Sequence, residues 1–358
     1  MDEQILKTIE EVDASAQEMA EAHMQLNKIR REAEAKEKAY RIKLETAEGK
    51  ALINKFLIGC DPEFVGLGSS GRIVYMNNFF PEKGKIGYDH GGAVGEFRPL
   101  PGKYAWTIIR RLKELIGDTK TVEGKLRAGA YVPTQESGRN FVTLGGHVHI
   151  DLDPYTTEET KHPFHRKSIP YEVYDQERYT KYGLYAAAWD TNSPTTTSGR
   201  YTNVILTGSG VQKVLSKEHT LRVKALDEYT RLLEHLDILP KKECESRRNT
   251  SDYGKYGDVR IQASGKAQRM EYRTMASWLY DPIVSFLCLT GAKVAAAEPE
   301  YTLETIGGKT SYLALLAFVD RFADKDMDCA RLAEKYLPKG LKAFQVDPNT
   351  DIRERWDV

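Results

Sequence analysis

The sequence predicts an α+β fold built on a largely antiparallel sheet with helices on its outer face. Between about residue 51 and residue 274, short segments that have the length and apolar content of strands alternate with helical patterns at uneven spacing. No internal repeat is evident. A βα barrel would need strands and helices at regular spacing. The uneven order therefore favours a mixed sheet.

Residues 1–50 are expected to form one long helix that is separate from the rest of the chain. This stretch has no Gly or Pro before Gly49, and apolar residues recur in it with a heptad step, at Ile5, Val12, Met19, Leu26, Ala33 and Tyr40. Such a stripe fits a helix docked on its own domain or an imperfect coiled coil. In the second case the helix would join copies of the chain into a homo-oligomer.

The remaining elements divide into a predicted catalytic domain over 51–290 and a helical extension over 291–358 packed on it. Strands are expected within 51–99, near 127–132, over 140–151 and over 199–206, and helices over 104–116, 220–238, 283–297, 311–323 and 327–337. The polar stretch 153–200 is expected to be irregular or a lid. Within it, the Thr- and Ser-rich residues 195–200 are predicted to be a loop, either solvated or binding phosphates.

Composition and charge exclude several classes of protein. Lys+Arg and Asp+Glu both number 52, so no overall charge directs the chain to nucleic acid or to an anionic membrane. The four cysteines form no Cys-x-x-Cys pair, which is typical of a protein in a reducing compartment without a zinc ribbon. With no recognisable signal peptide or membrane span, we expect a cytoplasmic protein that has no membrane partner.

Four stretches carry charged residues on one face of a predicted strand. Successive side chains in a strand point to opposite faces, so His147, His149 and Asp151 share one face while Val148 and Ile150 share the other. The other stretches group Asp61 with Glu63, Glu96 with Arg98, and Glu271 with Arg269 and Arg273. Charges that share a sheet face are costly unless they pair, bind metal or line a wet cavity. The mixed set predicts a site for cations and anionic substrate groups.

Each of these residues also has a structural interpretation. Asp61 and Asp151 stand at strand ends, where Asp commonly caps turns. His147 fits a structural histidine as well as a ligand, whereas His149 is favoured as functional. Glu271 and Arg273 could pair across the sheet, but a buried ion pair adds little stability, which favours a role in binding.

Four longer motifs occur in a defined order along the chain. They are Gly59-Cys60-Asp61-Pro62-Glu63-Phe64, Gly95-Glu96-Phe97-Arg98-Pro99, Gly145-Gly146-His147-Val148-His149, and Tyr256-Gly257-Asp258-Val259-Arg260 followed by Glu271-Tyr272-Arg273-Thr274. Together they resemble the motifs of the phage-type carboxylate-amine ligases, the type-2 amidoligase branch of the glutamine synthetase and glutamate-cysteine ligase fold. The resemblance spans residues 51–282. Asp89-His90-Gly91-Gly92 departs from the expected Asp-Gly, which leaves the role of Asp89 open.

The resemblance implies a funnel of antiparallel strands that binds ATP and magnesium and joins a carboxylate to an amine through an acyl-phosphate. Carboxylate oxygens suit magnesium, and the expected metal ligands are Asp61, Glu63, Glu96, His149 and Glu271. The arginines expected to be catalytic, by contacting the phosphoryl group or the substrate carboxylate, are Arg98, Arg260 and Arg273. The residues expected to bind the nucleotide are His147, His149, Arg200 and Arg269.

Two other functions stay open at this point. A metal-dependent amidohydrolase could use the His-x-His motif to bind zinc, but it would want further His and Asp ligands at later strand ends. A non-catalytic phage structural or binding protein on a degenerate ligase fold would explain the long N-terminal helix. For a ligase, the substrates would be a small-molecule or peptide carboxylate and an amine, in the host cytoplasm if the protein is phage-encoded.

Overall fold

The computed structural model describes residues 57–136, 139–150, 196–200, 204–206, 212–214, 217–250, 254–264 and 267–358. All of them belong to one compact unit, Leu52–Val358. The helix predicted over 1–50 and most of the lid predicted over 153–200 lie outside the described residues. The predicted division into three domains stays a prediction.

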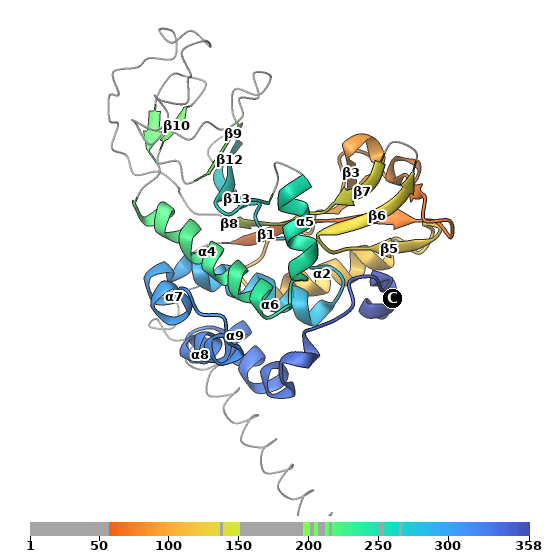
Figure 1. The fold of residues 1–358 in the computed structure, drawn as a ribbon. Helices are drawn as coiled ribbons and strands as arrows, with labels where there is room; N and C mark the ends of the chain where they lie inside the picture. The colour runs from red at the N-terminus through yellow and green to blue at the C-terminus, as the bar shows by residue number, and fades with distance from the viewer. Residues whose placement is uncertain are drawn as a thin grey trace, which may run out of the picture. The chain divides into compact units, whose positions relative to one another are not determined.

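An antiparallel sheet forms the centre of the described region (Figure 1). Its main path runs β3 (Ile86–Asp89), β4 (Val94–Phe97), β1 (Ile58–Leu67), β8 (Gly146–Ile150), β13 (Ala267–Tyr272), β12 (Asp258–Ser264) and β9 (Thr196–Arg200). The short strands β2 (Ile73–Val74) and β5 (Lys125–Arg127) pair with the second half of β1. Separate hairpins are formed by β6 (Tyr131–Glu136) with β7 (Arg139–Thr143) and by β10 (Val204–Leu206) with β11 (Gln212–Val214). The predicted α+β class with a largely antiparallel sheet is confirmed, and the funnel stays a prediction.

One local prediction is wrong. The residues before the strand predicted over 199–206 are predicted to be a loop, but Thr196–Arg200 form strand β9 and pair with β12. The β-branched threonines that suggested a polar loop also favour an extended chain, and the edge of β12 offers partners for its backbone groups.

The α-helices are α2 (Ala105–Gly117), α4 (Lys217–His235), α5 (Lys241–Thr250), α6 (Pro282–Ala297), α7 (Pro299–Ile306), α8 (Tyr312–Ala323), α9 (Met327–Arg331) and α10 (Ile352–Trp356). Helices α2, α4, α6 and α7 lie on one side of the sheet, whereas α5 runs past the level of the sheet (Figure 1). Shorter helical turns are η1 (Met76–Asn78), η2 (His90–Gly92), the π-helical η5 (Leu332–Tyr336), η6 (Leu337–Lys339) and η7 (Leu341–Ala343). Helix α6 contacts α2, α4, α7, α9 and β8, so it lies at the centre of the helical layer. Among the described residues, none of these helices is both long and apolar enough to cross a membrane.

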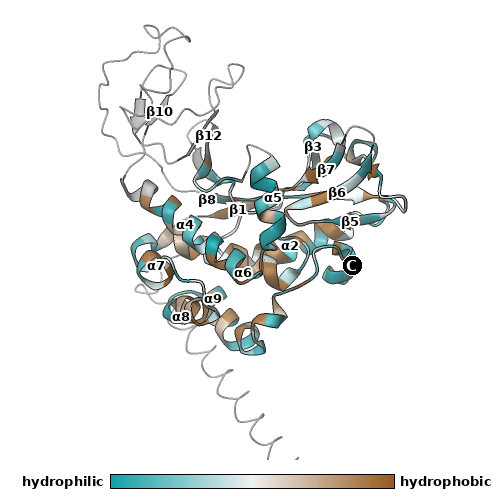
Figure 2. Ribbon diagram, viewed as in Figure 1, coloured by the Kyte–Doolittle hydropathy of each residue, from teal (hydrophilic) through white to brown (hydrophobic). Residues whose placement is uncertain are grey.

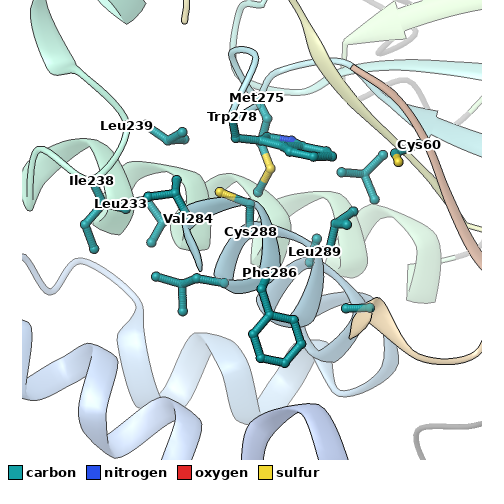
Figure 3. Close-up of a cluster of buried hydrophobic side chains, with 14 of the residues drawn as sticks. Cys60, Leu233, Ile238, Leu239, Met275, Trp278, Val284, Phe286, Cys288 and Leu289 are labelled. Atoms are coloured by element: carbon teal, nitrogen blue, oxygen red, sulfur yellow. The ribbon is translucent and has the colours of Figure 1, made fainter. Parts of the chain in front are cut away.

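Helix α6 lies inside the hydrophobic core. Every residue from Val284 to Ala296 is buried, and a helix that is apolar all round must be enclosed. Asp281 caps its first turn by accepting from the N–H groups of Ile283 and Val284. Figure 3 shows α6 residues packed with Met275, Trp278 and residues of α4. Figure 2 shows the contrast with α5, which is hydrophilic along its length.

Lys293 of α6 is fully buried and connects three helices. Its Nζ donates to Asp328 Oδ2 at 2.7 Å and also to Asp326, both of which belong to the start of α9. Asp328 in turn accepts from the N–H of Ala105 at 2.8 Å, at the first turn of α2. A single ammonium group therefore holds two buried carboxylates that fix α9 and α2 against α6.

Replacing Lys293 by Met is expected to lower the free energy of unfolding by about 3–5 kcal/mol, because two buried carboxylates lose their cation. Chemical denaturation measures this difference. Lys113→Met is the matched control: Lys113 lies 3.9 Å from Asp357 with half its side chain exposed, and its loss should cost about 1 kcal/mol at most. Equal effects of the two substitutions would contradict this account of the Lys293 cluster.

Candidate metal and anion site

The strand register brings the charged residues together on one face of the sheet. Asp61 of β1 stands opposite His147 of β8, and His149 of β8 stands opposite Glu271 of β13. On the other side of β1, Glu63 stands opposite Glu96 of β4. Charged residues from four strands that are far apart in sequence therefore lie close together.

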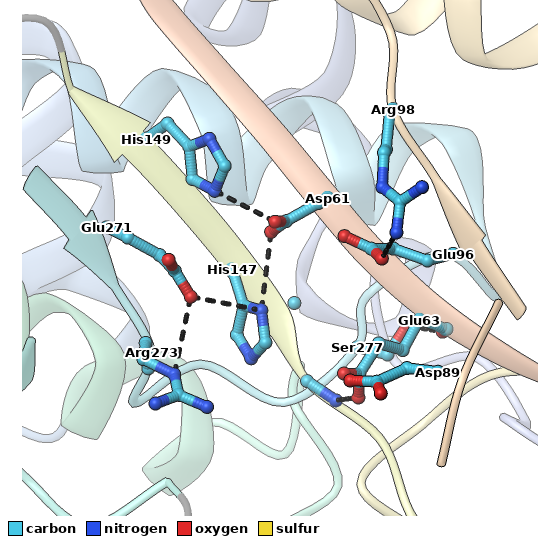
Figure 4. A network of polar contacts seen from close by, with 12 residues as sticks. Asp61, Glu63, Asp89, Glu96, Arg98, His147, His149, Glu271, Arg273 and Ser277 are labelled. Atoms are coloured by element: carbon cyan, nitrogen blue, oxygen red, sulfur yellow. Dashed lines mark hydrogen bonds and ion pairs between the residues drawn. The ribbon is translucent and has the colours of Figure 1, made fainter. Parts of the chain in front are cut away.

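Three residues of this face form a group that could hold a metal ion (Figure 4). The ligand atoms of Asp61, His149 and Glu271 all lie within 4.8 Å of one another. His149 Nε2 is 3.0 Å from Asp61 Oδ2. Even so, His149 Nε2 and Asp61 Oδ1 have no partner with hydrogen-bond geometry among the described residues. Buried polar atoms without good hydrogen bonds are costly, and two carboxylates with one imidazole suit Mg²⁺ or Mn²⁺. These residues therefore fit a divalent cation.

His147 has a different environment from His149. Its Nδ1 lies 3.3 Å from Asp61 Oδ1 and 3.6 Å from Glu271 Oε1. Burial lowers the pKa of His147, but the close contact with the Asp61 carboxylate, together with the charges of Glu63 and Glu271, outweighs burial and raises that pKa to about 9. His147 is therefore a cation near neutral pH and balances the carboxylates. Gly145 leaves room for the ring, since a Cβ there would lie 2.2 Å from His147 Nε2.

Asp61 and Glu96 are neighbouring carboxyl groups whose pKa values move apart. Burial disfavours the charged form of Asp61, yet His149 and His147 hold its pKa well below the usual range. Burial and the charge of Asp61 raise the pKa of Glu96 to about 8, although Arg98 opposes the shift. Glu96 therefore carries a proton near neutral pH.

These two pKa values predict how cation binding depends on pH. Between about pH 7 and about pH 9, Glu96 loses a proton and gains negative charge, and His147 loses its positive charge. Both changes favour a cation, so the affinity for Mn²⁺ should rise through this window. Electron paramagnetic resonance of free Mn²⁺ measures it, and Glu96→Gln should remove the step near pH 8. An affinity independent of pH would show that neither group is coupled to the cation.

Two arginines contact the acidic residues of the site. Arg273 Nε lies 3.3 Å from Glu271 Oε1, with its side chain 8% exposed. Arg98 pairs with Glu96 through one guanidinium nitrogen and donates to Glu82 O at 2.9 Å through the other. The Arg98 side chain is 34% exposed, so of these two cations it is the more accessible to a ligand.

The predicted metal ligands do not all gather in one group. Asp61, His149 and Glu271 come together, whereas Glu63 accepts a hydrogen bond from the N–H of Gly145 and lies outside the group. The hydroxyl of Ser277 donates to the main-chain oxygen of Glu63, which ties the Glu63 backbone to the segment between β13 and α6. The metal-binding roles of Glu63 and Glu96 stay predictions.

For three other predicted residues the structure gives the backbone position. Arg260 of β12 stands opposite Glu271, Arg269 of β13 stands opposite Gln262, and Arg200 of β9 stands opposite Asp258. The register thus places Arg260 in the same row as Glu271 and His149. Asp151 lies outside the described residues.

Arg247 was not predicted from the sequence, and Asp89 had no assigned role. Arg247 of α5 is buried and donates to the main-chain oxygens of Arg273 and Thr274. Helix α5 lacks the regular spacing of apolar residues that would have indicated which of its sides is buried. Asp89 is mostly exposed and accepts from the N–H of His90 at 2.7 Å, so it caps the turn between β3 and β4.

The fold and the site define a class of protein: an α+β protein whose antiparallel sheet presents a buried group of carboxylates and histidines beside arginines. The chain matches the sequence model of the family described as phage phiEco32-like COOH.NH2 ligase-type 2 over residues 58–157 and 212–314. This is more than half of the chain, which therefore belongs to that family, and the predicted family is confirmed. The matched segments contain Asp61, His147, His149, Glu271 and Arg273.

The chain also shows a likeness to the solved structure of a bifunctional glutathione synthetase from Pasteurella multocida. The identity is 12%, the TM-score is 0.39, and the likeness covers 88% of this chain and 50% of that chain. The chain thus spans about half the length of that protein, and a likeness at this level adds nothing to the assignment. No curated protein sequence matches the chain.

Proposed function

We propose that this protein is an ATP- and magnesium-dependent ligase that forms an amide bond between a carboxylate and an amine through an acyl-phosphate. The observation that supports this most is the group of Asp61, His149 and Glu271, next to the cations of His147 and Arg273, in a chain of a carboxylate-amine ligase family. Anionic phosphates and a divalent cation both find complementary charges there.

The proposed reaction has two steps. An oxygen of the substrate carboxylate attacks the γ-phosphorus of ATP, and the bond to ADP breaks. The amine nitrogen then attacks the acyl carbon, inorganic phosphate leaves, and the nitrogen loses a proton. Neither step needs a nucleophilic side chain, because positioning and electrostatics dominate catalysis of phosphoryl transfer.

The proposed role of each site residue follows from its charge and from its exposure. Asp61, His149 and Glu271 would hold Mg²⁺, which when bound supplies positive charge to the phosphate oxygens. Arg273, held beside Glu271, would contact the transferring phosphoryl group. Arg98 would bind the substrate carboxylate, because its planar guanidinium can form two parallel hydrogen bonds and is the more exposed of the two arginines.

The site supports a ligase better than the amidohydrolase alternative. Nδ1 of His147 faces the carboxylates of Asp61 and Glu271 at 3.3 and 3.6 Å, so among the described residues His149 is the one imidazole in the candidate metal group, where zinc would want the pair. The proposal also includes a cytoplasmic location and a homo-oligomer formed through residues 1–50.

Measuring ADP release by the full chain tests the proposed function. The reaction would contain ATP, Mg²⁺, a mixture of amino acids as carboxylates, and hydroxylamine as a small amine. We expect ADP release that requires Mg²⁺ and the carboxylates and is absent in Glu271→Gln. No ADP above the level of this variant would favour a non-catalytic binding protein. Hydrolysis of amides without ATP would favour the amidohydrolase.

A further inference from the structure

Arg247 of α5 reaches the main chain directly behind the site. Its residue is 2% exposed. One guanidinium nitrogen, Nη1, donates to Thr274 O at 3.1 Å, and the other, Nη2, donates to Arg273 O at 3.3 Å. Arg273 is the residue whose side chain contacts Glu271. The fork of Arg247 therefore holds the backbone at the point where Arg273 leaves strand β13.

The same backbone is also held by the start of β12 and by the turn before it. The N–H of Arg273 donates to Asp258 O at 2.9 Å, and the hydroxyl of Thr274 donates to Lys255 O at 2.9 Å. Residues 273 and 274 are thus fixed between this turn and α5. Of these contacts, the two from Arg247 come from a side chain of α5, which is not part of the sheet.

The turn is shaped around the Arg247 guanidinium. Gly254 has a φ of +75°, and a Cβ at this position would lie 1.9 Å from Arg247 Nη1. Glycine is therefore required both by its backbone conformation and by the space that the guanidinium occupies. Burial lowers the pKa of Arg247, and the charges of Glu63 and Asp258 oppose part of that shift. A lysine could not reproduce the two-carbonyl contact, because its ammonium is a single point on a flexible stem.

We propose that Arg247 is a positioning residue, which fixes the main chain of Arg273 so that the Arg273 guanidinium stays beside Glu271 in the site. The consequence for turnover rests on the proposed ligase function. The positioning itself rests only on the contacts of Arg247, Arg273 and Glu271.

Nuclear magnetic resonance of the arginine Nε–H groups tests the positioning without any activity. The Arg273 signal is identified as the one lost in Arg273→Lys. In Arg247→Lys we expect this signal to shift and its proton to exchange faster with water. The matched control is Arg353→Lys on α10, because Arg353 also donates to main-chain oxygens, those of Thr119 and Val122, which lie outside the site. An Arg273 signal that is the same in Arg247→Lys as in the natural protein would overturn the proposal.

Circular dichroism establishes whether each variant is folded. Arg247→Gln, which keeps an amide donor, replaces Arg247→Lys if the lysine variant unfolds. Unfolding of both would assign Arg247 to general stability and would also overturn the proposal.

Turnover measures the catalytic consequence. Arg247→Lys is expected to lower kcat on the order of tenfold or more, with a smaller change in KM for ATP, since misplacement of a contacting group mainly affects the transition state. In the Arg273→Lys background the same substitution should have little further effect, because both act through one group. If the loss of kcat in the double variant equalled the product of the losses in the two single variants, the two residues would act independently and the inference would be overturned. Lack of any ATP turnover by the natural protein would instead defeat the proposed function and leave the resonance result standing.

Discussion

Replacing Asp61 by Asn, or Glu271 by Gln, is expected to weaken Mn²⁺ binding by at least on the order of a hundredfold, since loss of even an outer partner of a metal ligand costs ten- to a hundredfold. Each substitution removes one of the two carboxylates in the group with His149. The positive charge of His147, which lies within 3.6 Å of both carboxylates, then opposes the cation with less compensation. Titration of Mn²⁺ followed by electron paramagnetic resonance gives the affinities.

Glu63→Gln is the matched control for these variants. Glu63 stands on the same strand as Asp61, but its carboxylate accepts from the N–H of Gly145 and lies outside the group. A loss smaller than about tenfold is expected for it, because a neutral amide can still accept this hydrogen bond. A hundredfold loss in Glu63→Gln would support the sequence prediction that Glu63 is a metal ligand. Normal binding by Asp61→Asn would refute the metal site described above.

The second large effect is expected for Arg273. Arg273→Lys should fold normally and bind Mn²⁺, yet lose turnover on the order of a hundredfold or more, because lysine cannot form the planar fork that stabilises developing charge. The measurements are ATP turnover under saturating Mg²⁺ and the melting temperature.

A purely structural Arg273 would give the opposite pattern. Lysine would keep the charge beside Glu271 and preserve turnover, while Arg273→Ala would lower the melting temperature by leaving a buried carboxylate without its arginine. An active and stable lysine variant would therefore move Arg273 from the catalytic residues to the structural ones.

Much of the site could be predicted from the sequence because side chains in a strand alternate with a strict period of two. That rule is local, so it placed His147 with His149, and Glu271 with Arg273, on shared faces. Which strands are neighbours is a long-range property. The position of β13 beside β8, which puts Glu271 opposite His149, could be expected only through the family resemblance.

The features that the sequence did not reveal have physical reasons. Glu63 shares a face with Asp61, but the turn at Gly145 provides an N–H that occupies its carboxylate, and no pattern in the sequence shows this contact. Helix α5 is almost wholly polar, so it lacks the apolar period from which helices and their buried sides are predicted. The buried position of Arg247 can be recognised only in the structure, where its guanidinium donates to the main-chain oxygens of Arg273 and Thr274.

The transfer of oxygen from the substrate to phosphate tests the central claim most directly. The full chain would be incubated with ATP, Mg²⁺, hydroxylamine and amino acids whose carboxylates carry ¹⁸O. In an acyl-phosphate mechanism the carboxylate oxygen becomes the bridge to phosphorus and leaves with it. We therefore expect one ¹⁸O atom in each inorganic phosphate formed with product, and none with Glu271→Gln. Product formation with unlabelled phosphate, or with the label in AMP, would contradict the proposed mechanism.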